Sequence, residues 1–322
     1  MAGYLSRRFF QTILILFFLS IVIYYMLGLM PGDPIDLLIG ANPKVTKEDI
    51  VRLKKIYGLD QPIYIRYFKW LKQVVLHHDL GFSRTHKKPT SELLQGRLVN
   101  TFKLMLASFL LSLLIALPIG IYSAIHHYSK SDFIISILAF IGISIPSFWL
   151  GLMLMALFSE RLGWLPASGM QTIGIESLSD KLKYMILPTL SVSVQSIGYW
   201  VRYMRSSMLE VIHKDYIRTA RAKGLDEEVI LFKHALRNAL IPIITIMALS
   251  LPGLVSGATI TEMIFSWPGM GRLLLDSVMS TDYYVAMIAF LLLAMLTMAS
   301  NFVADILYAV VDPRIRISSH AQ

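Results

Sequence analysis

The fold is decided by residues 101–125, which read TFKLMLASFLLSLLIALPIGIYSAI. Lys103, close to the start, is the one charged side chain in this stretch. A helix rises about 1.5 Å per residue, so about 20 apolar residues cross the roughly 30 Å hydrocarbon core of a bilayer. Residues 101–125 therefore predict a transmembrane helix.

Five further stretches satisfy the same criterion. They are Phe9–Met30, Phe133–Phe158, Met185–Met208, Asn238–Met263 and Tyr284–Val311. Buried helices of a soluble protein are a poor alternative for six runs of this length. We therefore expect an all-α integral membrane fold with six transmembrane helices. The first run is longer than the core of a signal peptide and ends at Pro31-Gly32-Asp33-Pro34, so we interpret it as a retained span.

The composition of the 322-residue chain also favours a membrane protein. Hydrophobic residues make up 55% and charged residues 16%, against about 25% charged in soluble domains, and the mean hydropathy is +0.60. We attribute the net charge of +9 to basic residues beside membrane spans. No basic stretch carries the interleaved aromatics of a nucleic-acid-binding module, so nucleic acid is not an expected partner. The absence of cysteine excludes disulfides, thiolate catalysis and cysteine-ligated metals.

The distribution of Lys and Arg predicts the orientation in the membrane. With the N-terminus inside, the inner segments hold Arg7, Arg8, Lys130, Arg202, Arg205, Lys214, Arg218, Arg221, Lys223, Lys233, Arg237, Arg314 and Arg316. The two short outer loops hold Arg161, Lys181, Lys183 and Arg272. This asymmetry predicts that both termini are cytoplasmic. The segment after the first span is basic too, but long loops cross largely regardless of charge.

Four parts follow along the chain: an N-terminal transmembrane helix (1–30), an extracytoplasmic segment (31–97), a five-helix core (98–311) and a cytoplasmic tail (312–322). The extracytoplasmic segment is expected to be partly helical. Helical spacing relates Ile50, Leu53, Ile56 and Tyr57, and a second amphipathic stretch, Tyr64–Val75, places Tyr67, Trp70, Leu71 and Val74 on one face. This segment is either a lid on the span ends or a surface that contacts an outside partner.

The cytoplasmic loop 209–237 within the core is expected to contain two short helices joined at a glycine. Residues 215–224 read DYIRTARAKG and residues 225–242 read LDEEVILFKHALRNALIP. Asp215 and Asp226 can cap the two helices, and Gly224 supplies a left-handed stop between them. The second helix runs directly into the fifth span. The loop is therefore either a handle that another protein grips or a surface loop whose charges lie near anionic lipid.

This loop resembles the cytoplasmic coupling loop of type I ABC importer permeases. The general pattern of that family is E-A-A, three residues, then G, and later I-x-L-P. Gly224 matches the glycine and Ala220 the second alanine, whereas Arg218 and Thr219 replace the first two letters. R-T-A-R-A-K-G-L and H-A-L-R-N-A-L are instead similar to the version found in oligopeptide and dipeptide permeases.

The resemblance covers nearly the whole chain. Residues 31–34 (PGDP), 57–62 (YGLDQP), 79–83 (DLGFS), 145–151 (IPSFWLG), 162–166 (LGWLP), 262–271 (EMIFSWPGMG) and 312–316 (DPRIR) agree with the same subfamily. The long outer segment after the first span is similar to the B-type subunit of the permease pair.

The resemblance implies a type I ABC importer transmembrane fold and a permease subunit that moves di- or oligopeptides across the cytoplasmic membrane of a prokaryote by alternating access. The implied partners are a second permease subunit, forming a heterodimer, two ATP-binding subunits, an extracytoplasmic peptide-binding protein and the lipid bilayer. The sequence has no G-x-x-x-x-G-K-S/T phosphate loop. We therefore expect no enzyme activity in this chain, with ATP and Mg²⁺ bound by the partner subunits. Nickel, glutathione or an oligosaccharide are alternative substrates.

Three sets of candidate site residues follow. Coupling to the ATPase is assigned to Tyr216, Arg218, Thr219, Ala220, Arg221, Lys223, Gly224 and Leu225. An outer gate or a docking turn for the binding protein is assigned to Glu262, Phe265, Trp267, Pro268 and Gly269, with an interfacial anchor as the alternative. Pore lining is assigned to Gln195, Tyr199 and Asn301, and interhelical hydrogen bonds are the alternative for the first two.

No catalytic or metal site is expected. Charges are scarce in the centres of the spans, which argues against an ion-coupled pump or channel. An intramembrane enzyme would need paired catalytic residues within the spans, and the sequence offers none.

Overall fold

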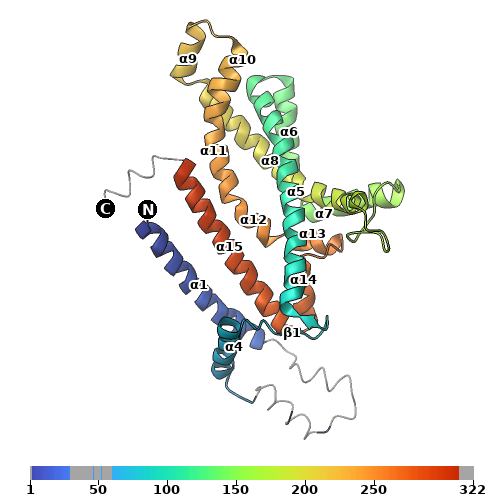
Figure 1. Cartoon of the computed structure of the whole chain (residues 1–322). Coiled ribbons are helices and arrows are strands. Elements are labelled where there is room, and N and C mark those ends of the chain that lie inside the picture. Colours follow the sequence, from blue (N-terminus) through green and yellow to red (C-terminus); the bar gives the residue numbers. More distant parts are fainter. Residues whose placement is uncertain (1, 30–45, 47–51, 53–59, 312–322) are drawn as a thin grey trace. The chain divides into compact units, whose positions relative to one another are not determined.

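The computed structural model describes residues 2–29, 46, 52 and 60–311 (Figure 1). The helix expected around Ile50–Tyr57, the motif at 31–34 and the tail motif at 312–316 lie outside these residues. The chain divides into two compact units. Unit 1 comprises Met1–Val99 and Arg272–Met298, and unit 2 comprises Asn100–Gly271 and Ala299–Gln322.

In unit 1, helix α1 (Ala2–Gly28) packs against α4 (Ile63–His77). The Tyr67 hydroxyl lies 2.8 Å from Ser20 Oγ, and the Tyr67 ring meets Tyr24 edge-on at 5.4 Å between centroids. Tyr67 and Trp70 are buried, whereas Tyr64 and Phe68 are exposed. The helix predicted over the amphipathic stretch 64–75 is therefore confirmed, and of its predicted inner face Tyr67 and Trp70 are buried while Leu71 and Val74 are half buried.

A short hairpin follows α4 in unit 1. Strands β1 (Phe82–Ser83) and β2 (Lys88–Pro89) pair antiparallel, with Ser83 opposite Lys88. The buried Ser83 hydroxyl donates to Asp282 Oδ2 at 2.7 Å, and the Thr85 N–H donates to the same oxygen at 3.2 Å. Asp282 lies between α14 (Met270–Met279) and α15 (Tyr283–Val311), so it fixes the hairpin to that turn.

Unit 2 holds most of the predicted five-helix core. Its elements are α5 (Thr90–Ile125, from Asn100 onward), α6 (Lys130–Ser144), α7 (Ser147–Leu154), the π-helix η1 (Met155–Arg161), α8 (Leu178–Ile212), α9 (Asp215–Ala222), α10 (Glu227–Val229), the π-helix η2 (Ile230–Ala235), α11 (Leu236–Leu249), α12 (Leu251–Ser256) and α13 (Thr259–Ile264). Buried side chains of α5, α6, α8, α9, η2 and α11 form one apolar cluster.

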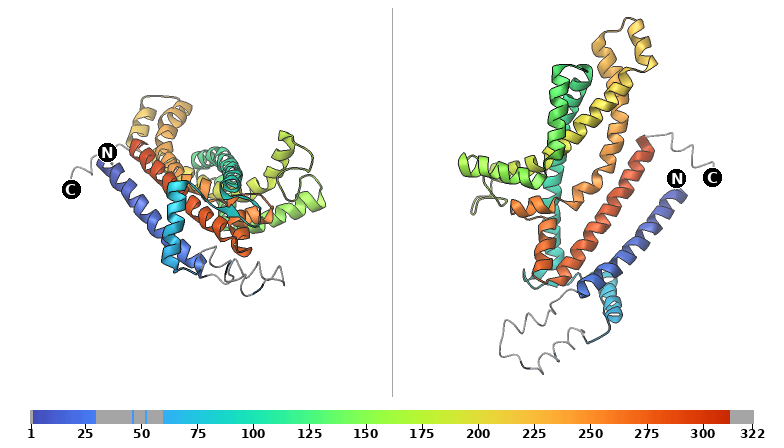
Figure 2. Two further views of the ribbon diagram at one scale, coloured as in Figure 1. Left: turned by 60° about the horizontal axis from the view of Figure 1, so that its bottom comes forward. Right: turned by 180° about the vertical axis from the view of Figure 1, so that it is seen from behind.

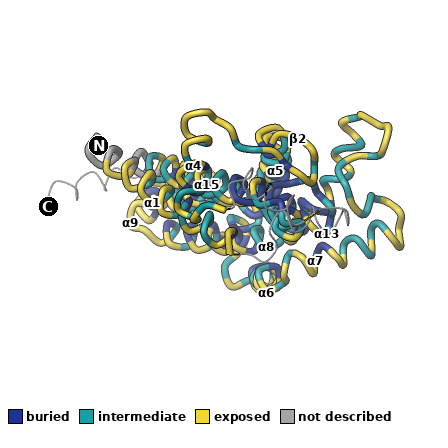
Figure 3. Tube along the Cα trace, turned by 90° about the horizontal axis from the view of Figure 1, so that it is seen from below, coloured by how far each residue is buried: buried dark blue, intermediate teal, exposed yellow. Residues whose placement is uncertain are grey.

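Glycines bring α6 and α8 into close contact within unit 2. A Cβ at Gly198 would lie 2.5 Å from the Ala139 carbonyl oxygen, and one at Gly142 would lie 3.2 Å from that of Val194. Small residues at such crossings let helix backbones approach closely, which is a common packing mode of membrane helices. The exposed residues of α6 are mostly apolar and appear yellow in Figure 3, as expected for a helix in lipid.

Four helices among the described residues are long and apolar enough to cross a membrane, or five if the bent pair of α6 with α7–η1 forms one span. The predicted fourth span lies in α8, whose serines lower its hydropathy, and it is not among them. The count of six spans therefore stays a prediction. Helix α5 begins at Thr90, earlier than the predicted start of the second span at Thr101.

The predicted third span is bent in the structure and is not one straight helix. Helix α6 ends at Ser144, α7 begins at Ser147, and the two directions differ by 98°. Pro146 lacks an N–H and disfavours helical geometry in the residue before it, and Ile145 is extended with ψ 121°. The predicted fifth span is also interrupted, because Gly257 with φ +76° separates α12 from α13.

Candidate coupling site

Helix α9 ends in a glycine turn that the sequence predicts. Gly224 has φ +74°, the left-handed conformation that favours glycine. Its N–H donates to the Arg221 carbonyl at 3.0 Å, and the Leu225 N–H donates to that of Ala220 at 3.4 Å. These two bonds form a Schellman motif, which satisfies carbonyls that the end of the helix leaves without partners.

The start of each short helix differs from the expectation. Lys214 occupies the N-cap of α9, and Asp215 is its first residue, where it accepts a hydrogen bond from Arg218 Nη2 at 2.6 Å. Asp226 occupies the N-cap of α10, but its side chain makes no capping hydrogen bond. Acidic groups in the first turn still match the positive end of the helix dipole.

An ion pair spans the glycine turn. The guanidinium of Arg221 donates from Nη2 to Glu227 Oε1 at 2.6 Å and from Nε to Glu227 Oε2 at 3.2 Å. The hydrogen bond to this carboxylate raises the pKa of Arg221 above its usual value. Both side chains are about half exposed, so the pair contributes little to the free energy of folding. Its main effect is to orient the two helices on either side of the turn.

One face of α9 is anchored in unit 2. Ile217 and Ala220 are buried and belong to the same apolar cluster as Ile230 and Ala235 of η2. Helix α11 continues directly from η2, and the Ser207 hydroxyl of α8 donates to the Ala239 carbonyl of α11 at 2.7 Å. Packed side chains and this hydrogen bond therefore connect α9 with α8 and α11.

The other face of α9 is exposed in the part of the chain that the structure describes. The predicted coupling residues Tyr216, Arg218, Thr219, Arg221, Lys223, Gly224 and Leu225 are all exposed, whereas Ala220 is buried. Helices α9 and α10 lie together at one end of α8 and α11 (Figures 1 and 2). Helix α9 therefore has one exposed, mostly polar face and one buried, apolar face.

The predicted gate residues lie inside unit 2. The side chains of Glu262, Phe265 and Trp267 are buried, and so is Gly269, while Pro268 is half buried. The Trp267 indole N–H donates to the Asn100 carbonyl at 3.1 Å. Contact between these side chains and a binding protein would require the turn to open, so docking stays a prediction.

The predicted pore-lining residues have different surroundings. Gln195 is half buried and donates from Nε2 to the Ile143 carbonyl at 3.3 Å, which is the interhelical hydrogen bond given above as its alternative. Tyr199 and Asn301 are exposed. Pore lining stays a prediction for all three residues.

The chain is similar to membrane components of known transport systems. The family described as "Binding-protein-dependent transport system inner membrane component" matches residues 116–317, and the corresponding N-terminal family matches residues 1–104. The chain is 44% identical over 317 residues to the oligopeptide transport system permease protein AppB of Bacillus subtilis, covering 98% of this chain and 99% of that protein.

The chain belongs to this family of ABC importer permeases.

Other relatives of this permease carry related names. It is 39% identical to a putative peptide permease protein of Brucella ovis, over 99% of this chain and 100% of that protein. It is 36% identical to the glutathione transport system permease protein GsiC of Salmonella paratyphi A, over 98% and 99%. The permease is also similar in fold to an inward-facing MetNI methionine ABC transporter structure, with 19% identity, a TM-score of 0.55, and 69% of this chain and 97% of that chain covered.

An ion pair that the sequence analysis missed lies in unit 2 of this permease. Arg205 of α8 donates from Nε to Asp132 Oδ1 at 2.6 Å and from Nη2 to Oδ2 at 2.8 Å. The Ser123 hydroxyl of α5 donates to the same carboxylate at 2.5 Å. Asp132 is buried, so these bonds tie α5, α6 and α8 together at one point. The sequence signal for this ion pair was weak, a single acidic residue close to the start of the third predicted span.

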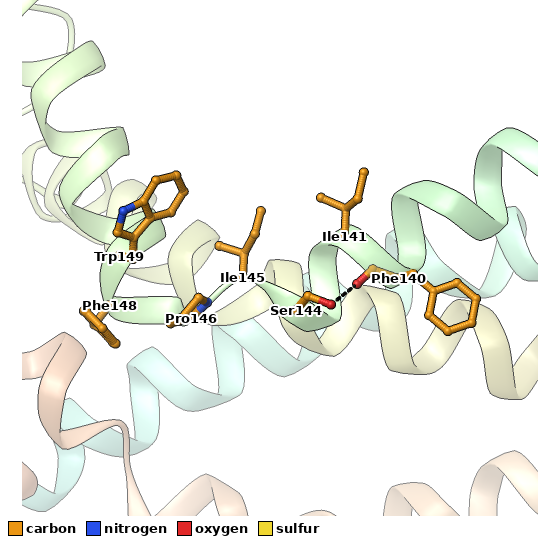
Figure 4. A pocket seen from close by; sticks show the side chains of 7 residues that line it. All are labelled: Phe140, Ile141, Ser144, Ile145, Pro146, Phe148 and Trp149. Atoms are coloured by element: carbon orange, nitrogen blue, oxygen red, sulfur yellow. Dashed lines mark hydrogen bonds between the residues drawn. The ribbon is translucent and has the colours of Figure 1, made fainter.

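The bend between α6 and α7 opens into an apolar hollow of about 530 Å³. Figure 4 shows Ile141, Ile145 and Trp149 pointing to the same side of the bend. The Ser144 hydroxyl is already bonded to the Phe140 carbonyl at 2.8 Å. The residues that line the hollow carry no charge, so the charged ends of a peptide would find no partner there, and we do not assign it to substrate.

Proposed function

We propose that this permease imports peptides as one of two permease subunits in the cytoplasmic membrane of a prokaryote, with both termini in the cytoplasm. The other permease completes the pathway, two ATP-binding subunits hydrolyse ATP with Mg²⁺, and an extracytoplasmic binding protein delivers the peptide. The 44% identity over almost the full length to an oligopeptide permease carries this proposal.

The structure of the coupling loop supports an ATP-driven mechanism. Closure of the two ATP-binding subunits would pull the exposed face of α9. Because Ile217 and Ala220 are packed into the core, the pull would be passed to α8 and α11 rather than absorbed by a flexible loop. The spans would then alternate between outward and inward openings as rigid bodies.

Reconstitution tests the function directly. We expect purified complex in lipid vesicles, supplied with its binding protein, to accumulate labelled di- or oligopeptides only when ATP and Mg²⁺ are present on the cytoplasmic side. Complex with a hydrolysis-deficient ATP-binding subunit is the matched control. ATP-independent uptake would overturn the proposal, since it would indicate a channel.

A second substrate class is tested in the same vesicles. Glutathione is tested as a separate competitor, because the permease is 36% identical to a glutathione permease. Nickel and an oligosaccharide complete the set of alternatives. We expect unlabelled di- and oligopeptides to compete with the labelled peptide, and glutathione, nickel and an oligosaccharide to compete weakly. Strong competition by one of these three, with none by peptides, would assign the importer to that substrate.

A further inference from the structure

Glu262 is a carboxylate with no exposed surface in unit 2. It lies on α13, and the hydroxyl of the equally buried Thr101 on α5 donates to its Oε1 at 2.7 Å. Burial of a carboxylate is costly unless hydrogen bonds compensate for the lost water. A contact of this kind between two separate helices therefore fixes their relative position.

Thr101 also bonds to the turn that follows α13. Its Oγ1 accepts the Met270 N–H at 2.7 Å. The neighbouring Asn100 donates from Nδ2 to the Pro268 carbonyl at 3.0 Å, and its own carbonyl accepts the Trp267 indole N–H at 3.1 Å. Residues 100–101 of α5 are thus bonded to α13, to the turn and to the first residue of α14.

Two glycines leave the space that this arrangement needs. A Cβ at Gly269 would overlap the Glu262 carboxylate. At Gly257, which has φ +76°, a Cβ would lie 3.2 Å from Glu262 Oε1 and 2.9 Å from Thr101 Cγ2. Gly257 and Gly269 therefore leave the room that one buried carboxylate needs.

We propose that Thr101 and Glu262 form an internal clamp, the Thr101–Glu262 clamp, which keeps residues 100–101, α13 and the turn 265–269 together as one rigid piece throughout the transport cycle. Separation of these parts would leave buried donors and acceptors without partners in an apolar environment. Glu262 and Thr101 are thus positioning residues, and the outer gate opens by movement of the whole piece rather than by opening of this turn. The inference rests on the proposed ATP-driven import.

Distance measurement in the assembled importer tests the clamp. The chain has no cysteine, so spin labels can be attached through Lys103→Cys on α5 and Met263→Cys on α13 without removing native thiols. Both positions are exposed. We expect one narrow distance distribution by pulsed electron paramagnetic resonance, unchanged between ATP-free, ATP-bound and hydrolysing complex. A distance that shifts on ATP binding would overturn the clamp, because the turn itself would then be the gate.

Variants of Thr101 give the second measurement. Thr101→Val keeps the shape but removes the hydroxyl, so we expect a broader label distribution and fewer peptides imported per ATP hydrolysed. Thr101→Ser restores the hydroxyl and is expected to restore both. A narrow distribution and wild-type coupling in Thr101→Val would overturn the clamp. If the Thr101→Val complex does not assemble, the label distances of the complex with Thr101 in its three ATP states still test the clamp.

The label-free complex separates this inference from the proposed function. Absence of ATP-driven peptide uptake in that complex would refute the function. Normal uptake together with a moving Lys103–Met263 distance would refute only the clamp.

Discussion

Gly224 holds a backbone conformation that side chains branched at Cβ rarely adopt, at a position where the chain itself leaves open space. Its φ is +74°, and apart from its two chain neighbours no described residue has an atom within 4 Å of a Cβ built there. The requirement for glycine could come from the backbone or from a partner that approaches closely. Two substitutions separate these causes, because asparagine tolerates the left-handed conformation and valine does not.

We expect Gly224→Val to destabilise the turn by roughly 1–2 kcal/mol and to lower peptide uptake per ATP hydrolysed. Gly224→Asn keeps the turn but adds a side chain toward the partner. Normal coupling in Gly224→Asn would show that the backbone alone requires glycine. Loss of coupling with a stable complex would show that the ATP-binding subunit needs the space. Unchanged coupling in both variants would contradict a gripping role for this loop.

Mutations in the Asp132–Arg205 ion pair should lower the stability of the folded protein by different amounts. We expect Asp132→Asn to destabilise the protein by roughly 3 kcal/mol, because it leaves a partly buried guanidinium without its charged partner. Arg205→Lys keeps the charge but loses the two-point geometry, so its loss should be smaller. Thermal denaturation of the purified complex compares them. A larger loss in Arg205→Lys than in Asp132→Asn would contradict this account.

Residues differ in how far the sequence predicts them. The role of Gly224 follows from local rules, since a helix needs a left-handed stop and glycine provides it. The Asp132–Arg205 pair joins positions 73 residues apart, and no local rule pairs them. Burial of Glu262 was likewise not predictable, because it depends on Thr101 of another helix. The sequence assigned Glu262 to an outer gate or a docking turn, which stays a prediction, and the structure buries its side chain.

At the scale of the element, α9 has two faces that should respond differently to mutation. Ile217 is fully buried and Tyr216 is about half exposed. We expect Ile217→Ala to cost about 2–4 kcal/mol by leaving a cavity, and so to lower the thermal stability of the complex. Tyr216→Ala should leave stability unchanged but weaken ATP-driven uptake. The reverse pattern would show that the assigned inner and outer faces are wrong.

Elements with a strong periodic pattern were predicted well. Helix α4 has the predicted inward face, because Tyr67 and Trp70 recur at helical spacing and pack on α1. The third span shows where this approach fails. No charged residue interrupts the stretch 133–158, so hydropathy indicates one helix, while the backbone turns by 98°. Proline permits such a bend without requiring it, since α5 continues through Pro118.

For the whole molecule, the orientation in the membrane can be tested on two exposed loop residues of unit 2. Tyr128 lies between α5 and α6, and Ile173 lies between η1 and α8; their exposed fractions are 90% and 100%. In intact cells, a membrane-impermeant maleimide should label Ile173→Cys and not Tyr128→Cys. Permeabilised cells should label both, which controls for reactivity. Labelling of Tyr128→Cys alone in intact cells would reverse the orientation and place α9 out of reach of ATP.

The touching backbones of α6 and α8 have a consequence for how the molecule meets bilayers of different thickness. Interdigitated side chains can adjust to a helix shift by changing rotamer. The Ala139 carbonyl that lies against Gly198 cannot adjust in this way. A helix that is longer than the bilayer is thick relieves the hydrophobic mismatch by tilting, by kinking or by local thickening of the bilayer. Because the two backbones touch, we expect a thinner bilayer to tilt α6 and α8 together as one rigid pair.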